Sequence, residues 1–341
     1  MNTSRTKNVR FNDNSTCLAS RKICQRVIFY NSMANKASRS IRDQIELLKQ
    51  RGMIIHDQKA AELHLSCISY YRLKGYWWEM QCDKDRHLFA EGACFEAVIA
   101  HYLFDKELRL ILFDAIESIE IALRAKMIYH LSQSYGGLFY ADSSLFVDES
   151  LYRQHLRDLK EEFMRSGEVF AKEYKRKYGI WERGCCVALA EQPDAWIVFE
   201  VATFGTLSKM YKNLRHQLSE KSRIANDFGL NRHNELSSWL EAISYLRNIV
   251  AHHSRVWSRN MVKRPMEIKK PKGTWLSRPL PEAGKKKPYF IITAMLYLCN
   301  AIHTGGTYKQ KILALIKKNP EIPIFRLGFL DHWEDEPIWC E

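Results

Sequence analysis

Apolar residues recur with a helical period through most of the chain, and residues 105–134 form the longest such stretch. Its apolar positions follow one another at intervals of three or four residues, which places them on one face of an α-helix. A second face is polar and includes Glu120 and Arg124, which are four residues apart in the order that favours an ion pair. The apolar stripe consists of Leu108, Leu112, Ala115, Ile119 and Ala122.

The same spacing predicts further helices on both sides of this stretch. Ser40 and Asp43 form a capping-box pattern at the start of one helix, and Asp57 is a suitable N-cap for the next. Residues 179–194 are predicted to be a loop, and no segment alternates as a β-strand would. The sequence therefore predicts an all-α fold. The other predicted helices cover residues 149–164, 168–178, 199–214, 221–229, 234–259, 289–303 and 308–318.

The composition agrees with a globular helical protein. Of 341 residues, 46% are hydrophobic, while the low counts of glycine (15) and proline (9) disfavour a turn-rich β fold. No apolar run reaches the roughly 20 residues that cross a bilayer, and the N-terminus lacks a secretory signal pattern. The nine cysteines form no CxxC pair, so they fit reduced thiols in the cytosol better than a disulfide framework or a zinc site. We therefore expect a cytoplasmic protein that needs neither a metal nor another cofactor.

Positive charge is concentrated in two segments. The net charge is +13; residues 1–32 contribute +5 and residues 259–287 contribute +8, so the rest of the chain is neutral. Residues 1–32 are predicted to be a disordered basic tail, with Met33 as a candidate natural start. Residues 260–288 are predicted to be a basic loop that contacts RNA or DNA, although a merely solvated loop has the same composition. The candidate RNA-binding residues are Lys263, Arg264, Lys269, Lys270, Lys272, Lys285, Lys286 and Lys287.

The C-terminal part of the helix predicted over 234–259 carries the most informative polar group. At about 100° per residue, Arg247, Asn248 and His252 fall within about 140° of the helix circumference. The opposite face is apolar. An arginine can hold a phosphate and offset the charge that grows on it, and a histidine can take a proton from a 2′-hydroxyl or give one to a leaving oxygen. The residues Glu241, Ser244 and Arg255 are predicted to share this polar face.

The spacing by itself leaves alternatives open. A surface arginine and histidine on an amphipathic helix are commoner than a catalytic pair. His253 has a similar spacing but projects away from the polar face, so His252 is the preferred candidate. Arg124 and His130 repeat the spacing on the long helix, although they lie about 120° apart around it. The aromatic-rich segment 69–78 is predicted to belong to the core rather than to stack on bases.

The residues around this polar group resemble a known family. Arg247, Asn248 and His252 match the R-x4–6-H motif of HEPN domains. Residues 247–259 (RNIVAHHSRVWSR) resemble the hallmark segment of the Abi-like (AbiD/AbiF-type) abortive-infection proteins of bacteria. The resemblance runs from about residue 40 to the end of the chain. It includes the blocks 69–76, 104–109, 116–124, 196–207 and 328–333.

The resemblance implies an α-helical HEPN-type bundle with additional N- and C-terminal helices. After the tail (1–32), an all-helical domain would cover residues 33–341. This domain would hold a HEPN core over about 95–260, the basic loop (260–288) and C-terminal helices (289–341).

The resemblance also implies a homodimer in which two motifs face one cleft. In each motif Arg247 would bind the scissile phosphate, His252 would act as acid or base, and Asn248 would support both. The supporting candidates are Glu120, Arg124, Arg255 and His253.

The function that the resemblance implies is phage defence by abortive infection. The chemistry would be that of a metal-independent endoribonuclease, in which attack by the 2′-hydroxyl leaves a 2′,3′-cyclic phosphate. Two alternatives remain at this point. One is a non-catalytic HEPN module that binds RNA, such as a small structured RNA. The other is a helical scaffold that senses a phage-derived trigger.

Overall fold

The computed structural model describes residues 38–302 and 306–340. It consists mainly of α-helices, with two short antiparallel sheets, and so confirms the predicted all-α class. The tail predicted over 1–32 and the candidate start Met33 lie outside the described residues. The helices are α2 (Ile41–Gln50), α3 (Gln58–Ile68), α4 (Tyr70–Trp77), α5 (Phe95–Tyr135), α6 (Glu149–Arg165), α7 (Val169–Tyr178), α8 (Ala195–Val198), α9 (Phe204–Asn213), α10 (Ser219–Asp227), α11 (His233–Ala251), α12 (Pro288–Ile302) and α13 (Tyr308–Lys318). The strands are β1 (Gln81–Asp83), β2 (Leu88–Phe89), β3 (Gly179–Glu182) and β4 (Cys185–Leu189).

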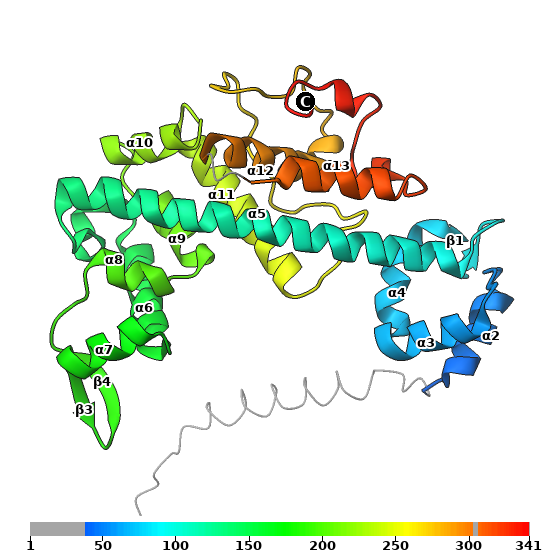
Figure 1. The fold of residues 1–341 in the computed structure, drawn as a ribbon, viewed down its shortest axis with the longest axis horizontal. Coiled ribbons are helices and arrows are strands. Elements are labelled where there is room, and N and C mark those ends of the chain that lie inside the picture. Colours follow the sequence, from blue (N-terminus) through cyan, green and yellow to red (C-terminus); the bar gives the residue numbers. More distant parts are fainter. Residues whose placement is uncertain (1–37, 303–305, 341) are drawn as a thin grey trace, which may run out of the picture.

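Helix α5 is the axis of the molecule (Figure 1). Helices α12 and α13 and the C-terminal segment lie along one side of it. On the opposite side, α2–α4 descend from one end of α5, and α6, α7 and the β3–β4 hairpin descend from the other end. Helix α11 crosses α5, and its C-terminal end projects between these two groups. This arrangement places the end of α11 in the concave part of the molecule.

The predicted N-caps of the first two helices are present. Ser40 and Asp43 form a capping box at the start of α2, and the Asp57 carboxylate accepts the Ala60 N–H at 2.9 Å at the start of α3. Helix α5 is longer than the predicted 105–134, because buried Phe95 already belongs to its apolar face. The helix therefore begins ten residues before the predicted start at Asp105.

The structure of segment 179–194 differs from the predicted loop. It contains the antiparallel pair β3–β4, whose tight connection is Arg183-Gly184 with φ of 48° and 80°. Two successive left-handed residues are typical of a two-residue hairpin turn. Trp181 and Val187 are about half exposed, so neither face of the hairpin shows the apolar-polar alternation that marks a strand.

Two other predictions are partly correct. The helix predicted over 199–214 is interrupted at Ala202, and the Thr203 side chain then caps α9 by accepting the Thr206 N–H. The aromatic segment 69–78 forms α4 and buries Tyr76 and Trp77, as the core interpretation predicts. The same helix leaves Tyr71 80% exposed, because only one face of α4 packs inward.

The C-terminal segment after α13 packs against α12. Trp333 and Trp339 are buried, and both rings pack against Phe329. Within the described ranges, none of the helices combines the length and apolar character that crossing a bilayer requires. The long α5 carries four exposed charged residues, Glu96, Lys106, Asp114 and Glu117.

Candidate active site

Helix α11 ends earlier than its sequence pattern predicts. The prediction extended this helix to residue 259, whereas its last helical residue is Ala251 and His252 is the C-cap. The His253 N–H donates to the Val250 carbonyl at 3.0 Å, and the Ser254 N–H donates to the Ile249 carbonyl at 2.9 Å. This pair of bonds is the Schellman motif, with His253 in the left-handed position (φ 54°) that glycine usually takes. Because no glycine stands at this position, the helix end cannot be recognised from the sequence.

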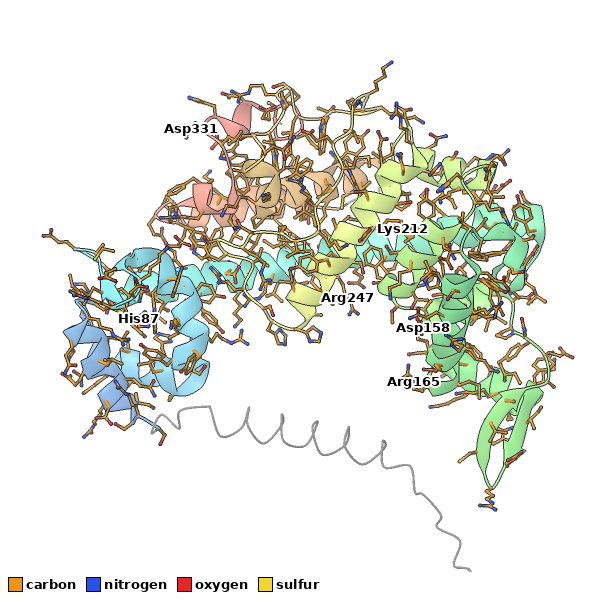
Figure 2. All side chains as sticks on the ribbon, turned by 180° about the vertical axis from the view of Figure 1, so that it is seen from behind. His87, Asp158, Arg165, Lys212, Arg247 and Asp331 are labelled. Atoms are coloured by element: carbon orange, nitrogen blue, oxygen red, sulfur yellow. The ribbon has the colours of Figure 1, made fainter. Side chains whose placement is uncertain are left out.

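The early end of α11 changes which residues belong together. Arg247 is half-buried and Asn248 is exposed on the last turns of the helix, and the C-cap His252 is exposed at its end. In Figure 2, Arg247 lies close to the end of α11 that projects into the concave side. Arg255 lies after the helix, so its predicted place on the polar face is wrong. The side chain of Arg255 instead packs against α4. Its Cδ lies 3.3 Å from the position that a Cβ atom would take if Gly75 carried a side chain.

A buried carboxylate on α5 anchors the turn that follows α11. Asp105 is fully buried, and its Oδ1 accepts the Trp257 N–H at 2.7 Å and the Val256 N–H at 3.2 Å. Its Oδ2 accepts the Tyr76 hydroxyl at 2.7 Å and pairs with the Arg109 guanidinium. Burial raises the pKa of Asp105, while the Arg109 charge and these donors oppose that rise. The carboxylate therefore links α4, α5 and the turn at one point.

Helix α4 holds the same turn from a second side. The Arg72 Nη1 donates to the His253 carbonyl at 2.7 Å, and the Ser258 hydroxyl lies 3.5 Å from the Glu79 carboxylate. Burial lowers the pKa of the Arg255 guanidinium, and nearby Asp105 opposes this effect. Neither Asp105 nor Arg72 could be predicted as a site residue from the sequence. No spacing rule connects them to α11, because their contacts span more than a hundred positions of the chain.

Two supporting candidates meet Arg247 at a cavity on α5. Glu120, Arg124 and Arg247 line a hollow of about 240 Å³ together with apolar side chains of the long helix. The predicted ion pair is present, with Arg124 Nη2 3.3 Å from Glu120 Oε1. Burial raises the pKa of Glu120, while the Arg124 and Arg247 charges oppose that rise. The hollow therefore presents two guanidinium groups and two carboxyl groups, those of Glu117 and Glu120. Its apolar lining residues are Phe113, Ile116 and Ile121, and Glu117 completes the set.

Arg124 is fixed more firmly than a surface ion pair would hold it. Its side chain is only 12% exposed, and its Nη2 also donates to the Ala202 carbonyl at 3.2 Å. Glu200 Oε2 lies 3.8 Å from Nη1. Because three partners surround the guanidinium, its direction toward the hollow is set by the fold rather than by solvent.

The second R-x5-H spacing does not form a comparable pair. His130 Nε2 lies 2.9 Å from the Asp227 carboxylate on α10, which also pairs with Lys126 at 3.2 Å. Arg124 instead faces the segment that precedes α9. The two side chains therefore serve different interfaces of α5.

The basic loop lies mostly away from Arg247. It runs back along α11 toward its N-terminal end: the Trp239 indole donates to the Met266 carbonyl at 2.7 Å, and the Asn231 side chain donates to the Lys270 carbonyl at 2.7 Å. Lys272 Nζ reaches the Asn226 side chain at 2.7 Å. The loop is thus anchored by specific contacts.

Several of the predicted RNA-binding cations in this loop are in ion pairs. Lys263 lies 2.5 Å from Glu241, and Lys285 lies 2.9 Å from Glu267. Glu282 pairs with both Arg264 and Lys285. Over residues 38–302 and 306–340, no carboxylate pairs with the remaining predicted cations. These are Lys269, Lys270, Lys272, Lys286 and Lys287.

The described part of the chain contains no cluster of three or more histidine, cysteine, aspartate or glutamate side chains suited to a metal ion.

No curated protein and no solved structure matches the chain. A family model does match: that of the Abi-like proteins, over residues 63–258, which is more than half of the sequence. The matched segment contains α4, the long α5 and all of α11 with the turn that Asp105 anchors. The chain therefore belongs to the Abi-like family, whose name refers to abortive infection.

Proposed function

We propose that this protein acts in phage defence as a metal-independent endoribonuclease of the HEPN type. The observation that supports the proposal is the meeting of Arg247 with Glu120 and Arg124 at one hollow, with the exposed Asn248 and His252 one and five residues after Arg247 in the chain. Two guanidinium groups next to an exposed histidine suit a phosphodiester, since they can neutralise its charge while the imidazole transfers a proton.

In the proposed reaction His252 removes the proton from a ribose 2′-hydroxyl, and the 2′-oxygen attacks the adjacent phosphorus. The bond from phosphorus to the 5′-oxygen of the next nucleotide breaks, and that oxygen takes a proton from an imidazolium. The products are a 2′,3′-cyclic phosphate and a free 5′-hydroxyl. Arg247 offsets the charge that grows on the phosphate oxygens, and Asn248 orients the phosphate or the imidazole. Arg124 supplies a second, firmly held positive charge.

A second copy of the chain would complete this site. Leu110 and Ile121 on α5 are 64% and 53% exposed, and Phe113 at the edge of the hollow is 43% exposed. At about 100° per residue, these three side chains and Arg124 fall within about 80° of the circumference of α5. An exposed apolar stripe beside a polar site is typical of an interaction surface. We propose that α5 pairs with its counterpart there, so that two copies of His252 serve one cleft as base and acid.

The proposal predicts that the purified protein cuts RNA in the presence of EDTA. We would compare the wild type with Arg247→Ala and His252→Ala, and use Arg223→Ala as a matched control because Arg223 is exposed on α10. The wild type and the control should give fragments with cyclic-phosphate ends. Each site variant should be at least about a hundredfold slower, as expected when a general acid–base or an oxyanion-stabilising group is lost.

Cleavage that persists in both site variants would contradict the proposed site. A folded wild-type protein that binds RNA without cutting it would contradict the enzymatic proposal and favour an RNA-binding module. The role in phage defence is tested separately. Cells that express the wild type should survive phage infection as a population, and this protection should be lost with Arg247→Ala.

A further inference from the structure

A second and larger cavity lies between α2, α3 and α4. Its volume is about 460 Å³, which is within the range of small-molecule sites. It belongs to the group of helices at the N-terminal end of α5, apart from the hollow that Arg247 lines (Figure 1). The lining residues are Ser38, Arg39, Gln44, Leu47, Arg51, Leu65, Ser69, Tyr70, Tyr71, Lys74 and His87.

The charge of this cavity has one sign. Arg39, Arg51 and Lys74 line it, and no lining residue is acidic. Within the described ranges, none of these three cations is in an ion pair, unlike Lys263 and Lys285 of the basic loop. Three cations that share a concave site without a carboxylate repel one another, and an anionic ligand would relieve that repulsion.

The cavity also carries aromatic and hydrogen-bonding groups. Tyr71 is 80% exposed at its rim, and its ring lies edge to face with that of Tyr70 at 6.0 Å. Tyr70 is itself held by the Arg51 Nη1, which donates to its hydroxyl at 3.1 Å, and by the Trp77 ring at 4.9 Å. An exposed ring on a fixed neighbour is a platform on which a base can stack, whatever the base. Gln44 adds an amide that can bond a sugar or base edge.

We propose that this cavity binds a nucleoside phosphate. Arg39, Arg51 and Lys74 would hold the phosphate, and Tyr71 would stack on the base. The ligand has two sources, a free nucleotide or the terminal nucleotide of an RNA strand, and both present the same chemistry. The inference does not depend on the proposed ribonuclease activity, because the cavity and the Arg247 hollow share no lining residue.

The cavity and the turn after α11 lie on two faces of the same short helix. Tyr71 and Lys74 of α4 line the cavity, whereas Arg72 of α4 bonds the His253 carbonyl. A ligand in the cavity would therefore contact the same helix that supports the turn after α11.

The test is calorimetric titration of the full chain with adenosine 5′-monophosphate, adenosine, inorganic phosphate and a 5′-phosphorylated RNA trinucleotide. Arg51→Gln, Lys74→Gln and Tyr71→Ala are compared with Lys59→Gln, an exposed α3 lysine that does not line the cavity. We expect saturable binding of the monophosphate that is about tenfold weaker in each cavity variant and unchanged in the control. Adenosine and phosphate should each bind more weakly than the monophosphate.

Tighter binding of the trinucleotide than of the monophosphate would identify an RNA end as the source, and the reverse order would identify a free nucleotide. Two results would overturn the inference. One is no saturable binding of either phosphorylated probe to folded protein. The other is equal affinity of the wild type and of Lys74→Gln, a variant that keeps the Arg51–Tyr70 contact and so does not depend on the stability of that contact.

Discussion

The carboxylate of Asp105, in the N-terminal third of α5, accepts the backbone N–H of Trp257 at 2.7 Å, although the two residues are 152 positions apart. The bond crosses from the axial helix to the turn that follows Arg247 and His252. It replaces the helical hydrogen bonding that ends when α11 stops at Ala251. A buried acceptor on α5 thus decides where the chain goes after the R-x4-H motif.

Substituting Asp105 by asparagine should disrupt this turn. The amide brings a donor against the N–H groups and the Tyr76 hydroxyl, and it leaves the buried Arg109 without its counter-charge. Breaking a buried pair in this way costs about 3–5 kcal/mol. We expect a loss of unfolding free energy of that order in urea denaturation. Cleavage should also fall in the fraction that stays folded.

Tyr76→Phe is the matched variant, because it removes one donor to Asp105 and one acceptor of the Arg109 guanidinium, and keeps the ring in place. Loss of each hydrogen bond of this kind costs about 1 kcal/mol. If Asp105→Asn is no more destabilising than Tyr76→Phe, then the carboxylate does not anchor the turn.

The variant His253→Gly should distinguish the role of His253 in cleavage from that of His252. His253 adopts φ 54°, its N–H donates to the Val250 carbonyl and its own carbonyl accepts from Arg72. Within the described residues its side chain forms no hydrogen bond or ion pair. Glycine tolerates this conformation and keeps the carbonyl, so the unfolding free energy should change by less than about 1 kcal/mol. Cleavage should remain in His253→Gly and fall at least about a hundredfold in His252→Ala, because only the latter loses the proposed acid–base group. The opposite ranking in initial cleavage rates would move the role to His253.

Glu120 should make RNA binding depend on pH. Its pKa is raised by burial above the usual 4.5. A carboxyl group with a raised folded-state pKa stabilises the fold most when protonated, and this contribution is lost as the pH rises through that pKa. Glu120→Gln imitates the protonated form, so it should not reduce thermal stability at neutral pH. It should also bind RNA more tightly, since one negative charge beside Arg124 and Arg247 is gone.

The measurement is fluorescence anisotropy at a series of pH values. The probe is a 2′-deoxy oligonucleotide, which lacks the attacking 2′-hydroxyl and so cannot be cut. An effect of about 1 kcal/mol corresponds to about fivefold in affinity. The difference between the wild type and Glu120→Gln should close as the pH falls through the raised pKa. A difference that is the same at every pH would show that this carboxyl group does not titrate in the range tested.

Leu110→Asp should separate the proposed dimer into monomers. Leu110 is 64% exposed on the apolar stripe of α5 but does not line the Arg247 hollow, so the substitution leaves the site of each chain intact. Sedimentation velocity should show a dimer for the wild type and a monomer for the variant, with loss of cleavage. Leu63→Asp, at an equally exposed leucine of α3, should remain dimeric. A wild type that sediments as a monomer would contradict the paired site.

Some of the candidate site could be predicted from the sequence because its parts are local. Glu120 and Arg124 are four residues apart on one helix, and the structure pairs them. Arg247 and Asn248 lie within α11, where the helical projection holds. The projection fails at Arg255, because His253 ends the helix in a left-handed conformation that a histidine does not signal.

The helical class, most helices and the polar group at the end of α11 could be predicted from local patterns, because each depends on contacts three or four residues apart. The tertiary structure sets which groups meet. It placed Arg247 against Glu120 and Arg124, directed the basic loop back along α11, and turned the chain at Asp105. Those arrangements depend on the burial of charged groups, which succeeds only where distant parts of the chain supply partners. No local pattern carries that information.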